Sequence, residues 1–305
     1  MAEGVETGRA ATERRGGMRG VASDYLTLTK PPIISLLLIT ATGGMFLAAE
    51  GVPPLQTLAM VLVGGALGAG GANAINHFLD QDIDALMSRT SRRPVASNRI
   101  APMSALAFGI ALNIAAFFVL AYWVNLLSAG LTLSATLFYL LIYTGWLKRT
   151  TPQNIVIGGA AGSIPPVVGW AAVTGGIELP ALYLFSIVFF WTPPHFWALA
   201  MLIQKDYRAA GVPMLPVVVG DERTTQNIFV YSLALVALTL LFAATDAVGL
   251  VYLASAVALG AGFMFLAWKL RREQTIRKAR HLYLYSLLYL ALLFAVMLID
   301  SVYRF

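Results

Sequence analysis

The sequence predicts an all-α integral membrane protein in which nine transmembrane helices form one bundle. Of its 305 residues, 58% are hydrophobic and 12% are charged, whereas an ordinary soluble domain has about 25% charged residues. The mean hydropathy is +0.74. Nine stretches of the chain are also long and apolar enough to cross a bilayer as helices, which takes about 20 residues each. These observations exclude a soluble enzyme, a disordered chain and a fibrous repeat.

The nine apolar stretches read as helices because they do not alternate apolar and polar residues, as the strands of a transmembrane barrel would. Lys and Arg occur only at their edges. Two stretches contain the proline pairs Pro165–Pro166 and Pro193–Pro194, which predict a break or a kink at each pair. In chain order, the expected helices cover residues 32–49, 54–75, 103–124, 126–146, 154–174, 180–203, 227–245, 247–269 and 281–300.

The basic residues predict how the bundle is oriented. All but one of the 21 Lys and Arg residues precede the first span or lie in the loops after the even-numbered spans, and the exception is Arg304. Because positively charged loops stay in the cytoplasm, we expect a cytoplasmic N-terminus and a periplasmic C-terminus. Residues 1–24 are expected to form a polar cytoplasmic tail without the apolar core of a signal peptide, and residues 25–305 the nine-helix transmembrane domain.

The expected location is the inner (plasma) membrane of a bacterium, because the tail is too rich in acids for an organellar transit peptide. The net charge of +6 follows from this topology, so it gives no reason to expect a nucleic-acid partner. The chain has no cysteine, which excludes disulfides, thiolate metal sites and a cysteine nucleophile. The lipid bilayer is therefore the first partner that the composition indicates.

A cluster of acids follows the second span. Asn76, Asp80 and Asp84 are spaced four residues apart, so on one continuous helix they would stay within about 80° of one face. Two carboxylates and an amide oxygen on one face suit Mg²⁺ held jointly with a substrate phosphate, since Mg²⁺ prefers oxygen ligands and takes few from protein. Asp82 would point away from this face. The alternative is a solvated helix end, where acids and bases only mark the membrane boundary.

Basic residues accompany the acids on the same side of the membrane, and a second mixed cluster follows the sixth span. Guanidinium groups bind phosphate oxygens as forked donors, so a diphosphate with Mg²⁺ would satisfy both clusters at once. The charged candidates outside the first acidic cluster are Arg89, Arg93, Lys148, Arg149, Lys205, Arg208 and the acid Asp206.

Three histidines complete the set of candidate residues. His281 begins the last span and is expected to be a boundary residue, whereas His77 lies beside the acidic cluster. His195 lies deep in the sixth span, in the aromatic stretch Trp191–Trp197. A polar side chain inside a membrane helix is a functional candidate by default, although a histidine hydrogen-bonded to a neighbouring helix is an equally good interpretation.

Taken together, these motifs resemble a known family. Asn76-x₃-Asp80-x₃-Asp84, followed by Met87-x-Arg89-Thr90-x₂-Arg93-Pro94, resembles the intramembrane prenyltransferases of the UbiA-type superfamily. The similarity runs from about Lys30 to the end of the chain. Three further stretches are similar to the branch of this superfamily that farnesylates protohaem, and they are residues 143–154, 191–197 and 205–216.

The resemblance implies the UbiA-type architecture and a transferase activity. In that branch the farnesyl group of farnesyl diphosphate is joined to a vinyl group of protohaem IX (haem B) with addition of water, which gives haem O and diphosphate. Haem O then serves the biosynthesis of haem for terminal oxidases. A contact with haem A synthase or with the oxidase assembly machinery is a further expectation. The allylic diphosphate ionises when cations stabilise its leaving group, and the apolar bundle keeps water from the cation that forms.

Carried over residue by residue, the resemblance assigns roles to the candidates. Asn76, Asp80 and Asp84 become ligands of Mg²⁺ on the diphosphate. The basic candidates neutralise the departing charge. One feature departs from the family pattern, because the second motif usually has two aspartates and this chain has only Asp206. Asp206 is expected either to bind the metal through water or to orient Lys205 and Arg208. The basic residues that the resemblance assigns to the diphosphate are Arg89, Arg93, Lys148, Arg149, Lys205 and Arg208.

The haem acceptor is assigned to His195, with His77 as the competing candidate. Haem iron can take an axial imidazole, and Trp191, Phe196 and Trp197 could pack against a porphyrin face. Two alternative functions stay open. A prenyltransferase for a quinone precursor belongs to the same superfamily, but an aromatic acid has no use for an imidazole between large aromatic side chains. A secondary transporter would place ionisable residues near the bilayer midplane, whereas the acids here cluster at the cytoplasmic boundary.

Overall fold

The computed structural model describes residues 18–303, and this part of the chain consists of helices with short connections. Within it, nine helical segments are long and apolar enough to cross a membrane, so the predicted class and number of spans are confirmed. The helices are α1 (Met18–Thr29), α2 (Pro31–Ala48), α3 (Leu55–Leu79), α4 (Gln81–Leu86), α5 (Pro102–Trp123), α6 (Leu126–Leu137), the π-helix η1 (Phe138–Leu147), α7 (Lys148–Thr150), α8 (Asn154–Gly162), α9 (Ile164–Thr174), α10 (Leu179–Leu202), α11 (Gln204–Ala209), α12 (Leu215–Phe242), α13 (Leu250–Glu273) and α14 (Ile276–Val302).

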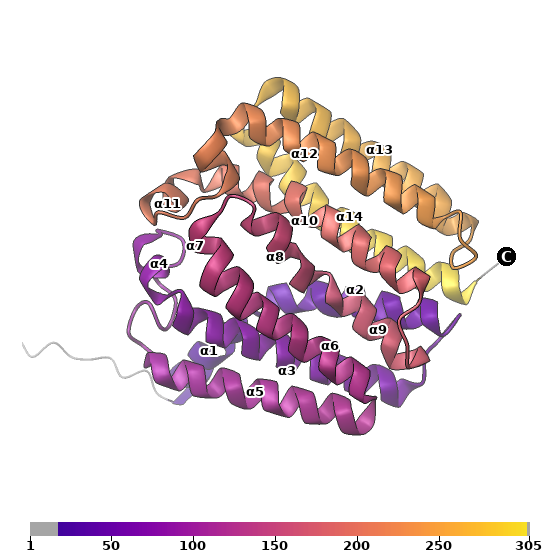
Figure 1. Cartoon of the computed structure of the whole chain (residues 1–305), viewed down its shortest axis with the longest axis horizontal. Helices are drawn as coiled ribbons and strands as arrows, with labels where there is room; N and C mark the ends of the chain where they lie inside the picture. Colours follow the sequence, from indigo (N-terminus) through magenta and orange to yellow (C-terminus); the bar gives the residue numbers. More distant parts are fainter. Residues whose placement is uncertain (1–17, 304–305) are drawn as a thin grey trace, which may run out of the picture.

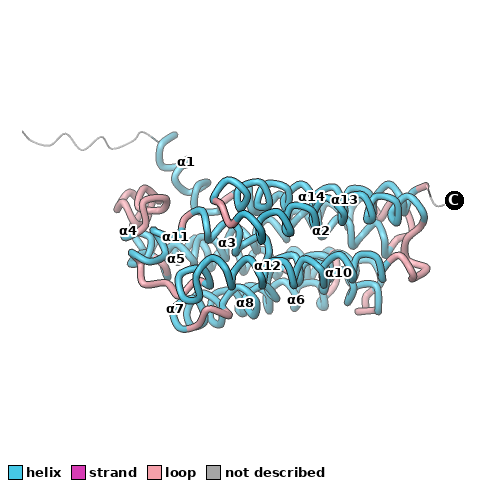
Figure 2. The backbone as a smooth tube through the Cα atoms, turned by 90° about the horizontal axis from the view of Figure 1, so that it is seen from above, coloured by secondary structure: helices cyan, strands magenta, loops and turns pink. Residues whose placement is uncertain are grey.

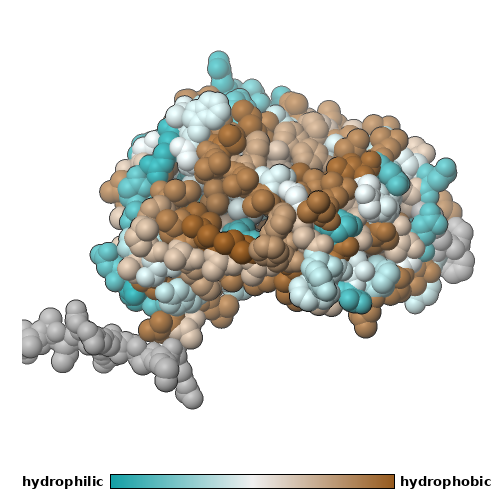
Figure 3. All heavy atoms as spheres, turned by 60° about the horizontal axis from the view of Figure 1, so that its bottom comes forward, coloured by the Kyte–Doolittle hydropathy of each residue, from teal (hydrophilic) through white to brown (hydrophobic). Residues whose placement is uncertain are grey.

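The long helices lie side by side along the long axis of the molecule, as Figure 1 shows. The short helices α4, α7 and α11 gather at one end of the bundle, and the described chain finishes at the opposite end (Figures 1 and 2). The face over α5 is mostly hydrophobic (Figure 3), and it includes the exposed side chains of Ile114 and Phe118. An apolar surface of this kind marks contact with lipid or with another protein, and together with the nine spans it identifies a multi-pass membrane protein.

Glycines let the helix that leads into the acidic cluster pack tightly against its neighbour. A Cβ atom added to Gly71 of α3 would lie 2.6 Å from the carbonyl oxygen of Gly109 in α5, and one added to Gly109 would lie 2.7 Å from the oxygen of Gly71. Small residues allow helix backbones to touch in lipid, where hydrophobic contrast cannot drive association. This contact fixes α3, and with it the position of Asn76 one turn before the helix ends.

The second half of the bundle is held together by aromatic packing. Phe242 of α12, Tyr252 and Phe263 of α13 and Tyr289 of α14 are fully buried. The rings of Phe263 and Tyr289 meet edge to face with 5.0 Å between centroids, a preferred geometry for aromatic pairs. This packing fixes α14 against α13, and α14 in turn contacts α10, on which His195 lies, through Ser286.

One span begins earlier than expected, and the two proline pairs have different outcomes. The seventh span begins at Leu215 rather than at residue 227, and its helix bends at Gly220, whose φ of 77° favours glycine. The break predicted at Pro165–Pro166 is confirmed, since α8 ends at Gly162 and α9 begins at Ile164. At Pro193–Pro194 a break or a kink was predicted, and the helix does not break there, because α10 runs through both prolines. Neighbouring helices can satisfy the backbone carbonyls that prolines leave free.

The expected boundary between tail and bundle, at residues 24 and 25, falls inside α1, which begins at Met18. This helix packs against the bundle through Tyr25, whose ring meets Phe108 of α5 edge to face at 5.0 Å. Arg99 also pairs with Asp24 at 3.0 Å. The remainder of the predicted tail, residues 1–17, lies outside the described residues.

Asp300 of α14 caps the start of α13, and its loss is expected to destabilise the bundle. The carboxylate is 2% exposed and accepts hydrogen bonds from the backbone N–H of Gly249 at 2.5 Å and of Tyr252 at 3.1 Å. Asp300→Ala would leave these donors buried without a partner, so we expect the free energy of unfolding to fall by about 1–2 kcal/mol. The measurement is thermal unfolding of the detergent-purified protein. Glu178→Ala is the control, because that exposed acid precedes α10 without a side-chain cap; equal effects of the two variants would contradict the prediction.

Candidate active site

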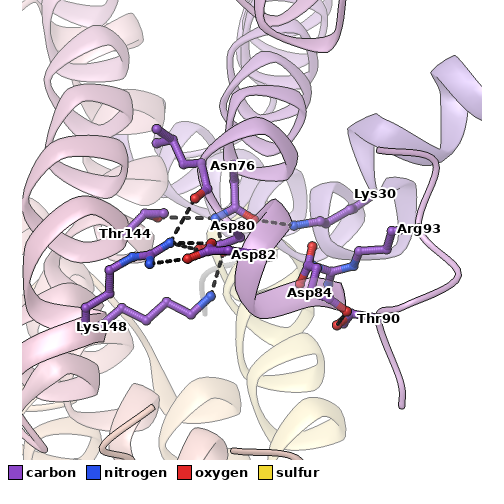
Figure 4. A network of polar contacts seen from close by, with 11 residues as sticks. Lys30, Asn76, Asp80, Asp82, Asp84, Thr90, Arg93, Thr144 and Lys148 are labelled. Carbon is purple, nitrogen blue, oxygen red and sulfur yellow. Dashed lines mark hydrogen bonds and ion pairs between the residues drawn. The ribbon is translucent and has the colours of Figure 1, made fainter. Parts of the chain in front are cut away.

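The acidic cluster and its cationic partners meet where α3 ends, at the end of the bundle that holds α4 and α7. Figure 4 shows the side chains converging there from four segments of the chain. Lys30 comes from the residue before α2, Asn76 and Asp80 from the end of α3, Arg93 from the loop after α4, and Lys148 from α7. The spans deliver these residues to one point although up to 118 positions separate them in sequence.

Asp80 is the centre of the network and is 1% exposed. Its Oδ2 atom accepts hydrogen bonds from Asn76 Nδ2 at 2.7 Å and from Lys148 Nζ at 2.6 Å. Its Oδ1 atom is buried and accepts no hydrogen bond from the described residues. The Nη2 atom of Arg149 lies 4.0 Å from Oδ1. Because buried polar atoms normally have partners, Oδ1 is the atom in this network that is best placed to receive a ligand.

The expectation that one continuous helix carries Asn76, Asp80 and Asp84 is wrong. Helix α3 ends at Leu79, and Asp80, with φ −97° and ψ 7°, leads into the separate helix α4. The N–H of Asp84 still donates to the carbonyl oxygen of Asp80 at 2.7 Å, so Asp84 stays on the inner side and is 2% exposed. The side chain of Asp82 is 61% exposed, as expected for a residue that points away from the cluster.

Asp84 is engaged by a single arginine. Arg93 Nη1 donates to Asp84 Oδ1 at 2.8 Å and to Oδ2 at 2.7 Å, and the loop between them is closed by a hydrogen bond from Thr90 Oγ1 to the Asp84 carbonyl oxygen at 3.0 Å. A buried carboxylate needs such a partner. Arg93, predicted as a diphosphate ligand, therefore lies beside the second carboxylate of the cluster.

Lys30 belongs to the site, and the sequence reasoning missed it as a site residue. Its Nζ atom donates to Asn76 Oδ1 at 2.9 Å. The residue has φ 54° and ψ 62° directly before Pro31, a left-handed conformation that is strained for lysine and disfavoured before proline. Burial, and secondly the charge of Arg93, lower the pKa of Lys30 from 10.5 to about 7. The sequence signal for Lys30 is its place directly before two prolines, but by charge alone this lysine indicates only the topology.

Helix η1 supplies another contact that the motifs did not indicate. Thr144 is fully buried and accepts a hydrogen bond from Asn76 Nδ2 at 3.3 Å. It lies within a π-helical stretch, a conformation that is rare and frequent at functional sites. Tyr143, the residue before Thr144, stacks on Tyr139 with 5.6 Å between their centroids. Asn76 is thus held from two sides, by Thr144 and by Lys30.

Lys148 and Arg149 lie in the last turn of the fourth span rather than in a loop. Arg149 donates to both oxygens of Asp82, at 2.6 and 2.8 Å, and to the carbonyl oxygen of Leu79 at 2.9 Å. The hydrogen bond from Arg149 lowers the pKa of Asp82 from 3.8 to about 2. Arg149 therefore ties α7 to α4, whereas Lys148 contacts the central carboxylate. A cavity of about 160 Å³ opens beside Arg149 and Asp82, and residues 210–212, which follow α11, form its other side.

Asp206 has partners other than the expected Lys205 and Arg208. Its carboxylate accepts hydrogen bonds from Ser88 Oγ at 2.8 Å and from the backbone N–H of Arg89 at 3.3 Å, and the bond from Ser88 is the main reason that the pKa of Asp206 is lowered. Lys205, Arg208 and Arg89 are exposed. The single acid of the second motif thus joins α11 to the loop after α4, and the expectation that it orients Lys205 and Arg208 is wrong.

The two candidate histidines have different surroundings. His77 is 1% exposed, and neither of its ring nitrogens has a hydrogen-bond partner among the described residues. His195 is 6% exposed, and its Nδ1 lies 2.7 Å from Ser286 Oγ. Both are buried in the bundle, but only His195 has a ring that a neighbouring helix holds through a hydrogen bond.

Aromatic rings enclose His195. The ring of Trp191 stacks on it with 4.4 Å between centroids, Tyr283 of α14 lies at 5.0 Å, and Phe196 meets it edge to face at 5.1 Å. Trp197, expected in this group, instead packs against Tyr231 at 5.3 Å. The enclosure is therefore built between two helices, because Tyr283 comes from the last span.

The residues of the acidic cluster fit a hard cation that also takes oxygen atoms from a ligand. Asp80 Oδ1 is a buried carboxylate oxygen without a hydrogen-bond partner, while Asn76 Oδ1 and Asp84 are already bonded to Lys30 and Arg93. Within residues 18–303, no group of three or more His, Asp or Glu could hold a metal by itself. Mg²⁺ commonly binds through one or two carboxylates and completes its shell with phosphate and water.

Comparisons with known proteins identify the family of the chain. Residues 37–299 match the model of the UbiA prenyltransferase family. The chain is 54% identical over 285 residues to a protein of Gloeobacter violaceus named protoheme IX farnesyltransferase, with 93% of each chain covered. It is 53% identical over 286 residues to a protein of the same name from Roseiflexus sp. (strain RS-1), with 94% of this chain and 54% of that protein covered, so the chain spans about half the length of that relative.

A solved structure has the same fold. A UbiA homolog from Archaeoglobus fulgidus, bound to GPP and Mg²⁺, aligns with 90% of this chain and 99% of its own, with a TM-score of 0.69 and 19% sequence identity. At this identity the likeness concerns the fold alone. The shared fold covers nearly the whole length of both chains.

Proposed function

The chain belongs to the UbiA prenyltransferase family, and on that premise we propose that it transfers the farnesyl group of farnesyl diphosphate to the vinyl group of protohaem IX. Diphosphate leaves the farnesyl carbon as that carbon bonds to one vinyl carbon, and water then adds to the other vinyl carbon with loss of a proton, so that haem O is formed. The observation that carries this proposal is Asp80, a buried carboxylate with one oxygen free of hydrogen bonds, beside Lys148 and at the end of an apolar bundle. The name of the Gloeobacter relative, which matches over almost its whole length, supports the acceptor.

We propose that Asp80, Asn76 and Asp84 hold Mg²⁺ together with the diphosphate. Asp80 Oδ1 is free to bind, whereas Asp84 and Asn76 are already in contact with Arg93 and Lys30, so most of the ligands would be oxygens of the diphosphate. When bound, Mg²⁺ stabilises the negative charge of the leaving group. The A. fulgidus homolog bound to GPP and Mg²⁺ supports Mg²⁺ with a prenyl diphosphate as the kind of ligand that this fold binds.

The cations around the cluster have two roles in the proposal. Lys30, Lys148 and Arg93 are in contact with its oxygens and neutralise the departing diphosphate. Arg89, Arg149, Lys205 and Arg208 are more exposed and meet the diphosphate as it enters from the cytoplasm. The apolar helices that extend from the cluster into the membrane exclude water from the allylic carbon until the acceptor has reacted.

The acceptor is proposed to lie against His195. Trp191 of α10 stacks on this ring and Tyr283 of α14 lies tilted against it with 5.0 Å between centroids, and flat aromatic surfaces of this kind pack against a porphyrin. His195 would hold the iron, with a vinyl group directed towards the farnesyl carbon that leaves the diphosphate. His77, adjacent to Asn76 and without hydrogen-bond partners, is the competing candidate.

The proposal is tested by incubating the purified full chain with farnesyl diphosphate, protohaem and Mg²⁺, and analysing the haems by mass spectrometry. A haem with the added mass of a hydroxylated farnesyl group supports it. If the same preparation prenylated a quinone precursor such as a hydroxybenzoic acid and left haem unchanged, the acceptor would be wrong and the alternative would stand. Binding of a haem A synthase, or of oxidase assembly proteins, belongs to the same proposal because they would receive haem O.

We expect a cytoplasmic N-terminus and a periplasmic C-terminus in the inner membrane of a bacterium. The reason is the bias of Lys and Arg to one side of nine spans. A phosphatase reporter fused after Phe305 should be active, and a fluorescent protein that requires the cytoplasm should be dark at the same position. The reverse pattern would contradict the orientation, and a fusion after Lys148, on the opposite side, serves as the control.

A further inference from the structure

Ser286 of α14 contacts both aromatic rings that the proposed function assigns to the haem. It is fully buried. Its hydroxyl lies 2.7 Å from Nδ1 of His195, and its backbone carbonyl oxygen accepts a hydrogen bond from Trp191 Nε1 at 2.7 Å. His195 and Trp191 stack on each other with an angle of 17° between their planes. A single residue of the last span thus contacts both members of the stack on α10.

The direction of the hydrogen bond to His195 follows from the other bond of the same hydroxyl. Ser286 Oγ donates to the carbonyl oxygen of Tyr283 at 2.7 Å. A serine hydroxyl has one proton, so with that proton engaged the oxygen can only accept from His195. Nδ1 therefore carries the hydrogen, and in the neutral ring Nε2 carries the lone pair.

Within residues 18–303 the ring of His195 forms its hydrogen bond through Nδ1, to Ser286, and its other contacts are with the rings of Trp191, Phe196 and Tyr283, so that Nε2 is left to a ligand. A histidine that served only to join α10 to α14 would need no second nitrogen of defined character. An imidazole ligates a metal through the nitrogen that is free, while a hydrogen bond from the other nitrogen fixes the orientation and the tautomer. The arrangement around His195 has both features.

We infer that Ser286 is a positioning residue for the haem acceptor, which orients His195 and holds it in the tautomer whose Nε2 binds the iron of protohaem. The inference rests on the proposed function, because it takes the porphyrin to be the ligand of His195. Ser286 itself does not touch the porphyrin iron; it acts through Nδ1 of His195. The bond from Trp191 reaches the backbone of Ser286, so it survives any change of the serine side chain.

The test is a titration of the purified full chain with ferric protohaem in the absence of farnesyl diphosphate, followed by absorption and electron paramagnetic resonance. We expect Ser286→Ala to weaken haem binding by about 10- to 100-fold and to alter the spectrum of the histidine-ligated iron, as for other changes behind a metal-binding histidine. Ser286→Thr keeps the hydroxyl and should bind as the wild type does. Ser286→Val has nearly the same shape as threonine without the hydroxyl, and should resemble Ser286→Ala.

A matched control is Ser232→Ala, because Ser232 is also fully buried in a span and donates only to its own helix, to Ile228 at 2.6 Å. This variant should bind haem normally. Since Ser286 acts through His195, the double variant Ser286→Ala/His195→Ala should be no worse than His195→Ala alone, which is the signature of coupled residues.

The inference would be overturned by a wild-type haem spectrum and affinity in Ser286→Ala and Ser286→Val, or by equal losses in the threonine and valine variants. Failure of the proposed function has a different signature. In that case wild-type protein forms no farnesylated haem in the mass-spectrometric assay, whichever residue stands at position 286.

Discussion

Replacement of Asp80 by asparagine is expected to abolish farnesyl transfer, with a loss of at least about 10²- to 10³-fold in kcat, the size seen when one electrostatic contact to a developing charge is removed. Asparagine keeps the volume and removes the negative charge that would bind Mg²⁺ through Oδ1. It is preferred to alanine because Lys148, 2.6 Å from Oδ2, would otherwise face a cavity. The measurement is the rate of haem O formation at saturating substrates, with thermal unfolding in detergent as the check on folding.

The neighbouring acids make this test specific. Asp84→Asn should also lose most of the activity, because Asp84 is 2% exposed and its partner Arg93 would be released. Asp82→Asn should cost much less, since its side chain is 61% exposed and its ion pair with Arg149 lies at the edge of the site. Equal losses in all three variants would show that the buried acids, Asp80 and Asp84, matter no more for catalysis than the exposed Asp82.

The number and type of the spans were predictable because lipid imposes a simple rule on the backbone. Every N–H and C=O group inside a bilayer must be satisfied within the protein, so a sufficiently long apolar stretch without charges has to be a helix. The rule weakens at the membrane boundary. The first turns of α12 were missed because Asp221, Glu222 and Arg223 interrupt the apolar pattern there, and because the bend at Gly220 depends on a backbone conformation that hydropathy does not report.

The identities in the acidic cluster were predictable from spacing and from the family pattern, but the pairing of charges was not. Asp80 and Asp84 remain buried although α3 stops at Leu79, because the hydrogen bond from Asp84 N–H to Asp80 O continues the turn. Which cation meets which acid depends on contacts between spans. Lys30 reaches Asn76 across 46 residues and Lys148 reaches Asp80 across 68, and a single sequence carries no signal for such distances.

The same limit applies to the surroundings of His195. The stretch Trp191–Trp197 indicated an aromatic site, and stacking of Trp191 on His195 was within reach of helical spacing. Tyr283 and Ser286 come from the last span. Their sequence context is an ordinary run of apolar residues, so only the packing of α14 against α10 reveals them.

Replacement of His195 by alanine is expected to remove the haem acceptor from the reaction while farnesyl diphosphate still binds. The ring lies between α10 and α14, whereas the charged cluster is built from α3, α4, α7 and the residue before α2. We therefore expect kcat/KM for protohaem to fall by about 10²-fold or more, roughly 3 kcal/mol of transition-state stabilisation, with the KM for farnesyl diphosphate nearly unchanged. Steady-state rates measured with each substrate varied in turn give the two values.

His77→Ala is the companion variant that decides between the two histidines. Its ring is buried without hydrogen-bond partners, so its removal leaves no donor or acceptor unsatisfied, and it follows Asn76 at the diphosphate end of the site. If His195 holds the iron, His77→Ala should leave kcat/KM for protohaem within a few-fold of wild type, and any loss should fall on farnesyl diphosphate instead. A large loss for protohaem in His77→Ala, together with a normal value in His195→Ala, would move the acceptor to the end of α3 and make the hydrogen bond between His195 and Ser286 a contact that only joins two helices.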